Sequence, residues 1–265
     1  MPVIQGLGGT FDSVADAYAR LRPGYPEGLY QAIFRCCPLG PESRAVEVGI
    51  GGGQATLPIL CTGCQVTAVE PGAQFSALCR EKFRDWPGFT VHTGVFEEAE
   101  FLPDSCDLVY AASSFHWVPE DIGSRKVCAI LKPGGVFARF ANHPGRAGDN
   151  PALSEEIDGL YRRYYDPFYH RSSAPDAPYG QAQARERAGI AARYGLTDMR
   201  WALFYRTRCY TAEEYTALLG TYSDHIALDQ GARRALLAGI GEAIDRHGGV
   251  IVLQDTIDLQ LARKP

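Results

Sequence analysis

The chain has 265 residues, of which 46% are apolar and 22% are charged, and it carries a formal net charge of −5. These values are ordinary for a globular protein, and a chain of this length can bury a large core without disulfides or bound metal. The negative net charge argues against nucleic acid as a partner, because nucleic-acid-binding proteins usually present a basic surface. No apolar run approaches the length of a membrane span, so we expect no membrane partner.

The cysteines and the first residues of the chain indicate its compartment. We expect no signal peptide, and hence a cytoplasmic protein whose eight cysteines are reduced. Cys61 and Cys64 form a single C-x-x-C, but no second cysteine or histidine pair has the spacing of a zinc site, so we expect no metal. We interpret the pair as two small residues near a helix end, with a redox pair as the alternative.

The first half of the chain alternates short apolar runs with helical patterns. Strands are predicted at residues 45–48, 65–70, 90–93, 107–111 and 135–141, and helices at 54–60, 73–84 and 119–131. The last helix is expected to end before a turn at residues 133–135. Strands that alternate with helices are typical of a parallel sheet with helices on both faces.

The second half begins with a break rich in proline and glycine at residues 143–151. Helical patterns, a proline-rich loop and a strand follow, and the last predicted strand carries its apolar residues on one face. A gap in this apolar pattern at Asp255 suggests a bulge. The predicted helices are 151–169, 181–194, 211–222 and 228–247, the loop is 172–180, and the strands are 199–208 and 250–262.

Four glycines within "GIGGG", residues 49–53, join the first predicted strand to the first predicted helix. Glycine is needed where a tight turn requires a positive φ, or where a ligand approaches bare backbone. The dinucleotide fingerprint G-x-G-x-x-G/A fails, because its third position is Gln54 or Thr56 in the two possible registers. The observed pattern is E-x-G-x-G-x-G, and Glu70 ends the second strand, where a carboxylate can bind the hydroxyls of a ribose.

Five motifs resemble those of class I S-adenosylmethionine (SAM)-dependent methyltransferases, in the same order. They are "AVEVGIGGGQAT", "VTAVEPGAQF", the third and fourth motifs within "GVFEEAEFLPDSCDLVYAASSFHWV", and "ILKPGGVFARF". The opening "FDSVADAYARLRPGYPEGLY" resembles a small-molecule branch of methyltransferase type 11 proteins that is similar to trans-aconitate methyltransferases. The resemblance covers nearly the whole chain.

This resemblance implies a Rossmann-like α/β fold. We expect a seven-stranded, mostly parallel sheet with an antiparallel last strand, helices on both faces and a helical lid. Residues 1–142 are expected to form the SAM-binding core, with a cover segment at 1–40. Residues 143–195 are the expected lid insertion, and 196–265 complete the sheet with two helices on the lid side.

The resemblance also implies SAM as the cofactor and assigns residues to it. Glu47 ties down the glycine loop, or is an edge-of-core carboxylate held by backbone donors. Phe96 stacks on the purine and Glu97 accepts its amino group, or Phe96 is a core residue and Glu97 is solvated; the family often has Asp early in this motif. The implied cofactor-binding residues are Glu47, Gly49, Gly51, Gly53, Glu70, Phe96, Glu97, Ala111, Phe115, Tyr18 and Arg22.

On the acceptor side, His116 is the only ionisable residue in "AASSFHW" and is a candidate base, although a structural or solvated role is the alternative. Trp117 forms a wall of the pocket or packs on the next helix. Arg162 and Tyr165 line an acceptor pocket, with the arginine holding an anion, or belong to an aromatic packing face. His143 and His225 are further candidates.

We therefore predict an enzyme that transfers a methyl group from SAM to a small molecule, with a carboxylate as one acceptor class. A carboxylate acceptor needs no base, whereas a hydroxyl or an amine does. The alternatives are a non-catalytic SAM-binding scaffold and an NAD(P)-dependent oxidoreductase, which the glycine spacing opposes. We expect a monomer or a homodimer.

Overall fold

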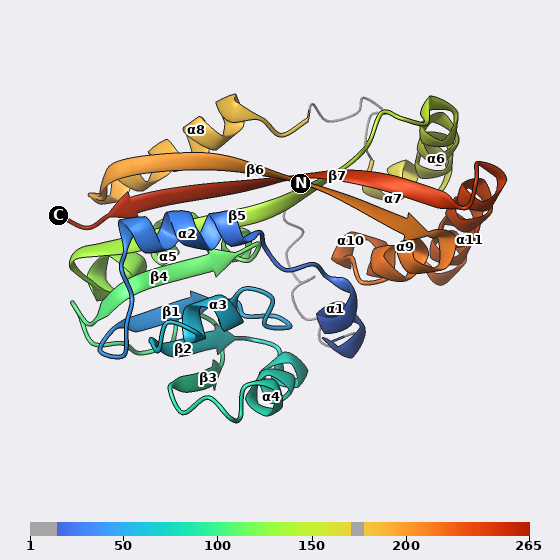
Figure 1. Cartoon of the computed structure of the whole chain (residues 1–265). Coiled ribbons are helices and arrows are strands. Elements are labelled where there is room, and N and C mark those ends of the chain that lie inside the picture. The colour runs from blue at the N-terminus through green and yellow to red at the C-terminus, as the bar shows by residue number, and fades with distance from the viewer. Residues whose placement is uncertain (1–14, 171–177) are drawn as a thin grey trace.

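The computed structural model describes residues 15–170 and 178–265. Its centre is one seven-stranded sheet in the order β3-β2-β1-β4-β5-β7-β6 (Figure 1). Neighbours from β3 to β5 pair in parallel, and β7 is antiparallel to both β5 and β6. The prediction of a mostly parallel sheet with an antiparallel last strand is confirmed. The strands are β1 (Arg44–Val48), β2 (Gln65–Glu70), β3 (Phe89–Thr93), β4 (Cys106–Ala112), β5 (Leu131–Arg146), β6 (Thr197–Thr211) and β7 (Val250–Arg263).

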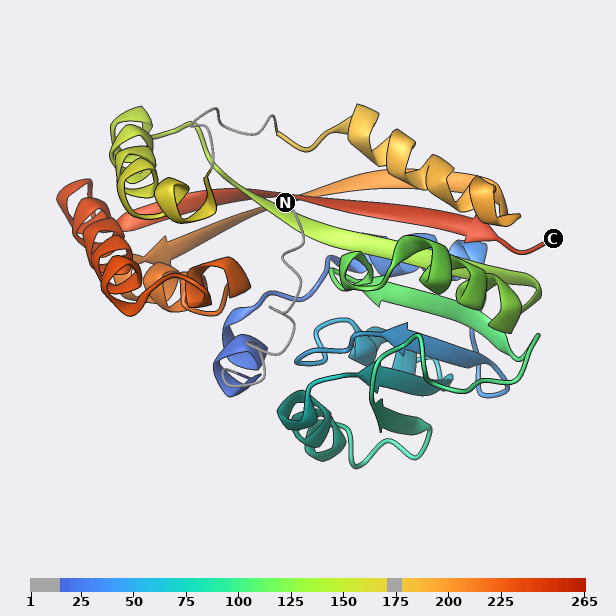
Figure 2. The same cartoon turned by 180° about the vertical axis from the view of Figure 1, so that it is seen from behind.

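Both faces of the sheet are buried, because successive side chains of a strand point to opposite faces. In β1, Ala45 packs into one core and Val46 into the other. The helices α2, α3 and α4 contribute to the first core, whereas α5 and η4 contribute to the second, and α8 packs against β6 and β7. Figures 1 and 2 show α2 and α5 on opposite sides of the sheet. These elements are α2 (Glu27–Cys36), α3 (Thr56–Leu60), α4 (Ala73–Lys82), α5 (Glu120–Ile130), α8 (Gln181–Gly189) and η4 (Ile190–Tyr194).

The long strands β5, β6 and β7 continue past the rest of the sheet and carry a second cluster of helices, which we call the helical group (Figure 2). This group has a core of its own, built on residues such as Leu218, Leu236 and Ile240. Thr211 and Glu214 form a capping box at the start of α9. The helical group comprises α6 (Pro151–Tyr164), α7 (Asp166–Tyr169), α9 (Ala212–Leu219), α10 (Ser223–Ile226) and α11 (Gln230–Arg246).

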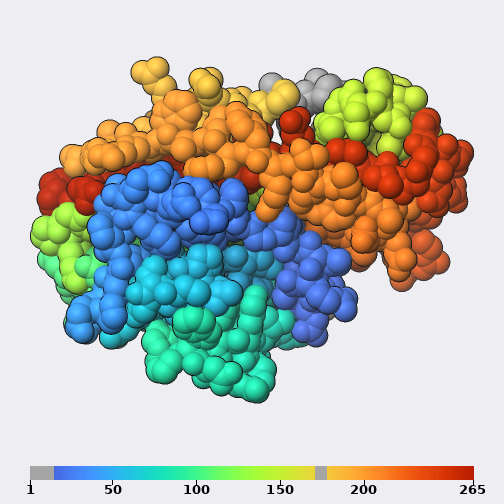
Figure 3. All heavy atoms as spheres, viewed as in Figure 1, coloured from blue at the N-terminus to red at the C-terminus, as the bar shows by residue number. Residues whose placement is uncertain are grey.

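Helix α1 (Ala15–Leu21) lies between the sheet and the helical group, as the blue atoms in Figure 3 show. It contacts the glycine loop so closely that a Cβ on Gly52 would lie 2.7 Å from the Cα of Ala19. At its other end, the Nε of Arg22 donates to the hydroxyl of Thr221, which follows α9, at 3.0 Å. The N-terminal segment therefore joins the two halves of the molecule.

Two expectations about β5 differ from the structure. Residues 143–146 were expected to be part of a break. They instead belong to β5, because they pair with β7 as far as Arg146, which lies opposite Leu253. The turn expected at 133–135 lies inside β5, where Gly134 has a φ of +81° and the pairing with β4 shifts register. The expected loop at 172–180 lies mostly outside the described residues.

Asp255 is not at a bulge. The pairing of β7 continues without a shift through Asp255, which lies opposite Pro144 on β5 and Arg206 on β6. The side chain stays on the buried face and binds two guanidiniums: Arg208 Nη2 reaches Oδ1 at 2.8 Å, and Arg206 Nη2 reaches Oδ2 at 3.0 Å. The gap in the apolar pattern marks a buried ionic cluster.

Candidate functional site

A cavity of about 390 Å³ opens at the carboxyl ends of β1, β2 and β4, between the sheet and the helical group. This is the position in which open α/β sheets bind their ligands. Its walls come from the glycine loop, helix α1, the segments after β2, β3 and β4, the part of β5 beyond its pairing with β4, and the start of α10. Among the residues that line it are Tyr18, Arg22, Gly49, Gly51, Glu70, Phe96, Glu97, His116, Trp117 and Asp224.

The glycine loop follows β1 and has positive φ values at Gly49 (+70°), Gly51 (+53°) and Gly53 (+71°). Gly49 and Gly51 line the cavity. A Cβ on Gly49 would lie 2.6 Å from the Cβ of Ser114, so no larger residue fits beside the end of β4. Gly53 faces the other way, since its Cβ would meet the ring of Phe83 at 2.7 Å. Gly53 therefore serves the packing of the loop and is not part of the cavity wall.

Glu70 ends β2 and lines the cavity, as its position at the strand end predicts. Its Oε2 accepts a hydrogen bond from the amide of Gly51 at 2.9 Å, and its Oε1 accepts one from the amide of Gly72 at 2.9 Å. The carboxylate is thus held by two backbone donors and fixes the shape of the glycine loop. A carboxylate oxygen can accept more than one hydrogen bond.

Glu47 lies beneath the glycine loop and is completely buried. Its Oε2 accepts hydrogen bonds from Thr56 Oγ1 at 2.7 Å and from Tyr110 Oη at 2.8 Å, while Oε1 has no partner among the described residues. Burial raises the pKa of Glu47 to about 7. These bonds link β1 to the start of α3 and to β4, so Glu47 holds the end of the glycine loop and does not face the cavity.

The segment after β3 supplies Phe96 and Glu97, and both line the cavity. Phe96 also belongs to the core on that face of the sheet and is 3% exposed. The ammonium of Lys126 lies 5.3 Å from the centre of its ring and donates to the backbone oxygen of Glu97 at 2.9 Å. Phe96 is therefore a core residue that also lines the cavity.

The segment after β4 divides into buried and cavity-facing residues. Ala111 and Phe115 are buried in the core, where Phe115 packs on Phe137 at 5.0 Å, so both lie behind the cavity and not in its wall. His116 and Trp117, in the short helix η3 (Phe115–Trp117), line it as expected. Desolvation and the guanidiniums of Arg187 and Arg139 lower the pKa of His116 to about 4.

Helix α1 places Tyr18 and Arg22 in the wall. The guanidinium of Arg22 lies 3.8 Å from the ring centre of Tyr222 and 4.9 Å from that of Tyr18, and it donates to Thr221. The ring of Tyr18 meets Phe75 edge-on at 5.2 Å. Arg22 is thus fixed at the point where the sheet side of the cavity meets the helical group.

The two remaining predicted acceptor residues lie outside the wall. Arg162 is on the surface, where its guanidinium pairs with Glu155 at 2.6 Å. Tyr165 is buried in the core of the helical group, and its hydroxyl donates to Asp224 Oδ2 at 2.7 Å. Residues 161–165, "YRRYY", therefore belong to the packing of the helical group. Tyr165 contacts the cavity residue Asp224.

Sequence reasoning missed several lining residues, among them Ser113, Asn142, Tyr222 and Asp224. Ser113 has a φ of +54°, and its Oγ shares a hydrogen bond with the hydroxyl of Tyr25 at 2.9 Å. A polar residue at the point where parallel strand pairing ends is a signal for such a site. Ser113 directly follows β4, and Asn142 lies in β5 two residues beyond the last pair with β4. Tyr222 and Asp224 come from the helical group, whose placement no local pattern reveals.

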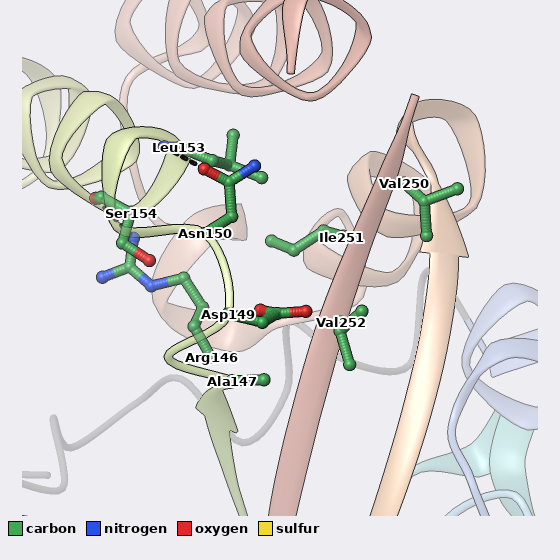
Figure 4. Close-up of a pocket in the computed structure, with 9 residues that line it drawn as sticks. All are labelled: Arg146, Ala147, Asp149, Asn150, Leu153, Ser154, Val250, Ile251 and Val252. Carbon is green, nitrogen blue, oxygen red and sulfur yellow. Dashed lines mark hydrogen bonds between the residues drawn. The ribbon is translucent and has the colours of Figure 1, made fainter. Parts of the chain in front are cut away.

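A second, smaller cavity of about 160 Å³ lies where the far ends of β5 and β7 meet α6 (Figure 4). Two of its polar side chains bind within the protein: Arg146 donates to the backbone oxygen of Ser154 and to Asp158, and Asn150 caps α6 by accepting from the amide of Leu153. In the part of the chain that the structure describes, no group of three or more His, Cys, Asp or Glu side chains is placed to hold a metal ion. Nor does that part contain a helix with the length and apolar character needed to cross a membrane.

Comparison with known proteins gives consistent matches. A family model described as a methyltransferase domain matches residues 46–138. An uncharacterized methyltransferase of Mycobacterium tuberculosis is 31% identical over 177 residues, which are 67% of this chain and 68% of the relative. An uncharacterized methyltransferase-like protein of Schizosaccharomyces pombe is 24% identical over 234 residues, 88% of this chain and 85% of the relative.

Two solved structures show the same fold. One, described as a type II methyltransferase of Anaeromyxobacter dehalogenans, has a TM-score of 0.62 and 23% identity, with 91% of this chain and 97% of that chain covered. The other is a phosphoethanolamine N-methyltransferase 2 of Haemonchus contortus in complex with S-adenosylhomocysteine and phosphomonomethylethanolamine. It has a TM-score of 0.52 and 19% identity, with 96% of this chain and 57% of that chain covered.

Proposed function

From the premise that this chain belongs to the methyltransferase family, we propose that its cavity binds SAM and that it transfers the methyl group to a small molecule. The observation that carries the proposal is the meeting of the glycine loop and Glu70 in one cavity, at the carboxyl ends of β1 and β2. The dinucleotide spacing is absent from this loop, which favours SAM over NAD(P).

The residues of the cavity fit SAM. Gly49 and Gly51 present bare backbone, and Glu70 presents carboxylate oxygens that suit ribose hydroxyls. Val69, Phe75 and Phe96 supply apolar surface for a purine, with Glu97 beside them as an acceptor for its amino group. The volume of about 390 Å³ is within the range of small-molecule pockets. The Haemonchus contortus enzyme, which has the same fold, was crystallised with S-adenosylhomocysteine and with SAM.

When bound, SAM supplies a methyl group on a sulfonium, which is reactive enough for direct displacement. The contribution of the protein is position and the exclusion of water. Arg22 offers its remaining N–H groups to the carboxylate of the methionine part, and Tyr18 covers the same end from α1. Ser113 and Trp117, at the end of β4, bound the space that the acceptor enters.

His116 is a weak base in this site. With its pKa lowered to about 4, the imidazole is neutral at pH 7 but has little affinity for a proton. We propose that His116 contributes shape and a hydrogen bond to the rim, and that the acceptor reacts without proton transfer to this residue.

We propose that the helical group acts as a lid. Tyr222 and Asp224 reach the cavity from this group, and its hydrophobic core is distinct from the two cores of the sheet. In limited proteolysis, the protease should cleave the protein more slowly when SAM and an acceptor are present. Cleavage at equal rates with and without these ligands would contradict a closing motion.

Two measurements test the proposal against its alternatives. Thermal unfolding should shift upward with SAM and S-adenosylhomocysteine and stay unchanged with NAD; a shift with NAD alone would favour an oxidoreductase. Formation of S-adenosylhomocysteine from SAM, followed over a panel of small amines, alcohols and carboxylates, separates an enzyme from a SAM-binding scaffold. A protein that binds SAM tightly and transfers no methyl group to any member would favour the scaffold.

A further inference from the structure

Asp224 brings a negative charge into the cavity from the side of the helical group. It lies in α10, lines the cavity together with Tyr222 and Ser223, and its side chain is 14% exposed. Glu70 and Glu97, the other acids of the wall, come from the segments after β2 and β3, on the sheet side. Asp224 is therefore separated from the residues that we assign to the nucleoside.

The carboxylate of Asp224 is held in place by donors from its chain neighbour His225 and from Tyr165, which lies between α6 and α7. Its Oδ1 accepts from the amide of His225 at 3.0 Å and from His225 Nδ1 at 2.9 Å, and its Oδ2 accepts from Tyr165 Oη at 2.7 Å. His225 is itself fixed, because its Nε2 shares a hydrogen bond with Tyr161 Oη at 2.9 Å.

This arrangement keeps Asp224 ionised. Burial acts to raise its pKa, but the hydrogen bonds from His225 and Tyr165 outweigh it and lower the pKa below the ordinary value. The two donors from His225 use both lone pairs of Oδ1, whereas Oδ2 accepts from Tyr165 and retains one lone pair for a ligand. A group of this kind in a cavity wall accepts hydrogen bonds and favours positive charge.

The positive charges near the acceptor space do not favour an anion. Arg162, the arginine that the sequence offered for a carboxylate, pairs with Glu155 on the surface. Arg22 lines the cavity, but its Nε and Nη2 are bound to Thr221, and in the proposed function its free donors serve the methionine part of SAM. The one charge that the helical group adds to the cavity wall, among the residues described, is thus negative.

We propose that the methyl acceptor is an amine, oriented by an N–H hydrogen bond to Asp224; this inference rests on the proposed function. The ammonium form of the amine first releases its proton to water, which is the base. The neutral amine then uses its lone pair to form the new N–C bond while the S–C bond breaks and its electrons stay on sulfur. Positive charge moves from sulfur to nitrogen, next to the Asp224 carboxylate, and the ammonium product later releases its proton to water. Asp224 stabilises the charge that develops in the transition state, and it needs no pKa near neutrality to do so.

Apolar surface for the rest of the acceptor is present beside Asp224. Tyr25, Trp117 and Pro144 line the same cavity. Aromatic faces also attract the cationic product. The site therefore suits a small amine with an apolar body.

The test uses two probes of matched size, phenethylamine and phenylacetate, titrated calorimetrically into the full chain saturated with S-adenosylhomocysteine. We expect phenethylamine to bind and phenylacetate to bind more weakly. Asp224→Asn should weaken phenethylamine by about 10–100-fold, because a hydrogen bond to a charged group is lost, and should leave the affinity for S-adenosylhomocysteine unchanged. Glu213→Gln, at an exposed acid of α9, is the matched control and should change neither affinity.

The outcomes separate the two proposals. If the unmodified protein fails to bind S-adenosylhomocysteine, the proposed function itself is wrong. If it binds S-adenosylhomocysteine but prefers phenylacetate, shows no phenethylamine binding at about 10 mM, or loses no amine affinity in Asp224→Asn, the amine inference is overturned. Transfer of the methyl group from SAM to phenethylamine, with kcat lowered in Asp224→Asn, would support the inference independently.

Discussion

Replacing Glu47 by glutamine should remove a pH dependence from the stability of the protein. Glu47 is completely buried, and burial raises its pKa from 4.5 to about 7. In the unfolded chain the carboxyl group has its ordinary pKa of 4.5. Between pH 4.5 and about pH 7, the folded state therefore binds up to one more proton than the unfolded state. Stability must therefore fall as the pH rises through this window.

The magnitude follows from the size of the shift. A difference of one pKa unit corresponds to about 1.4 kcal/mol, so a shift from 4.5 to about 7 corresponds to about 3 kcal/mol. Glutamine keeps an oxygen that can accept from Thr56 and Tyr110 but carries no charge at any pH. The free energy of unfolding of Glu47→Gln, relative to the unmodified protein, should thus rise by about 3 kcal/mol between about pH 4.5 and about pH 8.

Urea unfolding followed by circular dichroism at several pH values measures this difference, and titrations shared by both proteins cancel in it. Glu81→Gln is a suitable control, because Glu81 is exposed and pairs only with a neighbouring arginine on the surface. Its effect on the free energy of unfolding should be small at every pH. A difference between Glu47→Gln and the unmodified protein that stays constant with pH would refute the reasoning.

Three further predictions concern the loop, the buried ionic cluster and the rim. Gly49→Ala should lower the free energy of unfolding, measured with urea, more than Gly51→Ala does. The added Cβ would lie 2.6 Å from Ser114 in the first variant and 3.5 Å from Tyr18 in the second. Equal losses of unfolding free energy would contradict the geometry. Asp255→Ala should cost about 3–5 kcal/mol of unfolding free energy, since it leaves two guanidiniums without their buried partner, and a loss below about 1 kcal/mol would argue against that cluster. For His116→Ala, the ratio of its kcat to that of the unmodified protein should not change between about pH 6 and pH 9, because a group with a pKa of about 4 is already neutral there; a ratio that changes near pH 6.5 would show that His116 titrates as a base.

The sheet could be predicted from the sequence because each strand is a local signal. Short apolar runs bounded by turn residues gave β2 its observed limits and placed β1, β3 and β4 within one residue at either end. The resemblance supplied the antiparallel last strand, which no local pattern contains. The length of β5 was missed because its proline and glycine residues at 144–145 indicate a break, whereas pairing with β7 holds them extended.

The candidate site was predictable where it is built from strand ends. Gly49, Gly51 and Glu70 follow directly from β1 and β2, and the structure brings all three into one cavity. Ala111 and Phe115 are buried in the core behind the cavity. A motif alone does not show which of its residues are buried and which face a cavity. Asp224 was missed because its role depends on how the helical group packs against the sheet, which is a property of the tertiary structure.

Calorimetric titration of S-adenosylhomocysteine into the unmodified protein and Glu70→Ala tests whether the cavity beside the glycine loop binds SAM. We expect one binding site per chain in the unmodified protein. The affinity should be lower by about 30–1,000-fold in Glu70→Ala, because hydrogen bonds between a carboxylate and the ribose hydroxyls, worth about 2–4 kcal/mol, are lost. Unchanged circular dichroism would show that the variant is folded. No binding by the unmodified protein, or less than a threefold difference between the two proteins, would show that SAM does not bind beside Glu70.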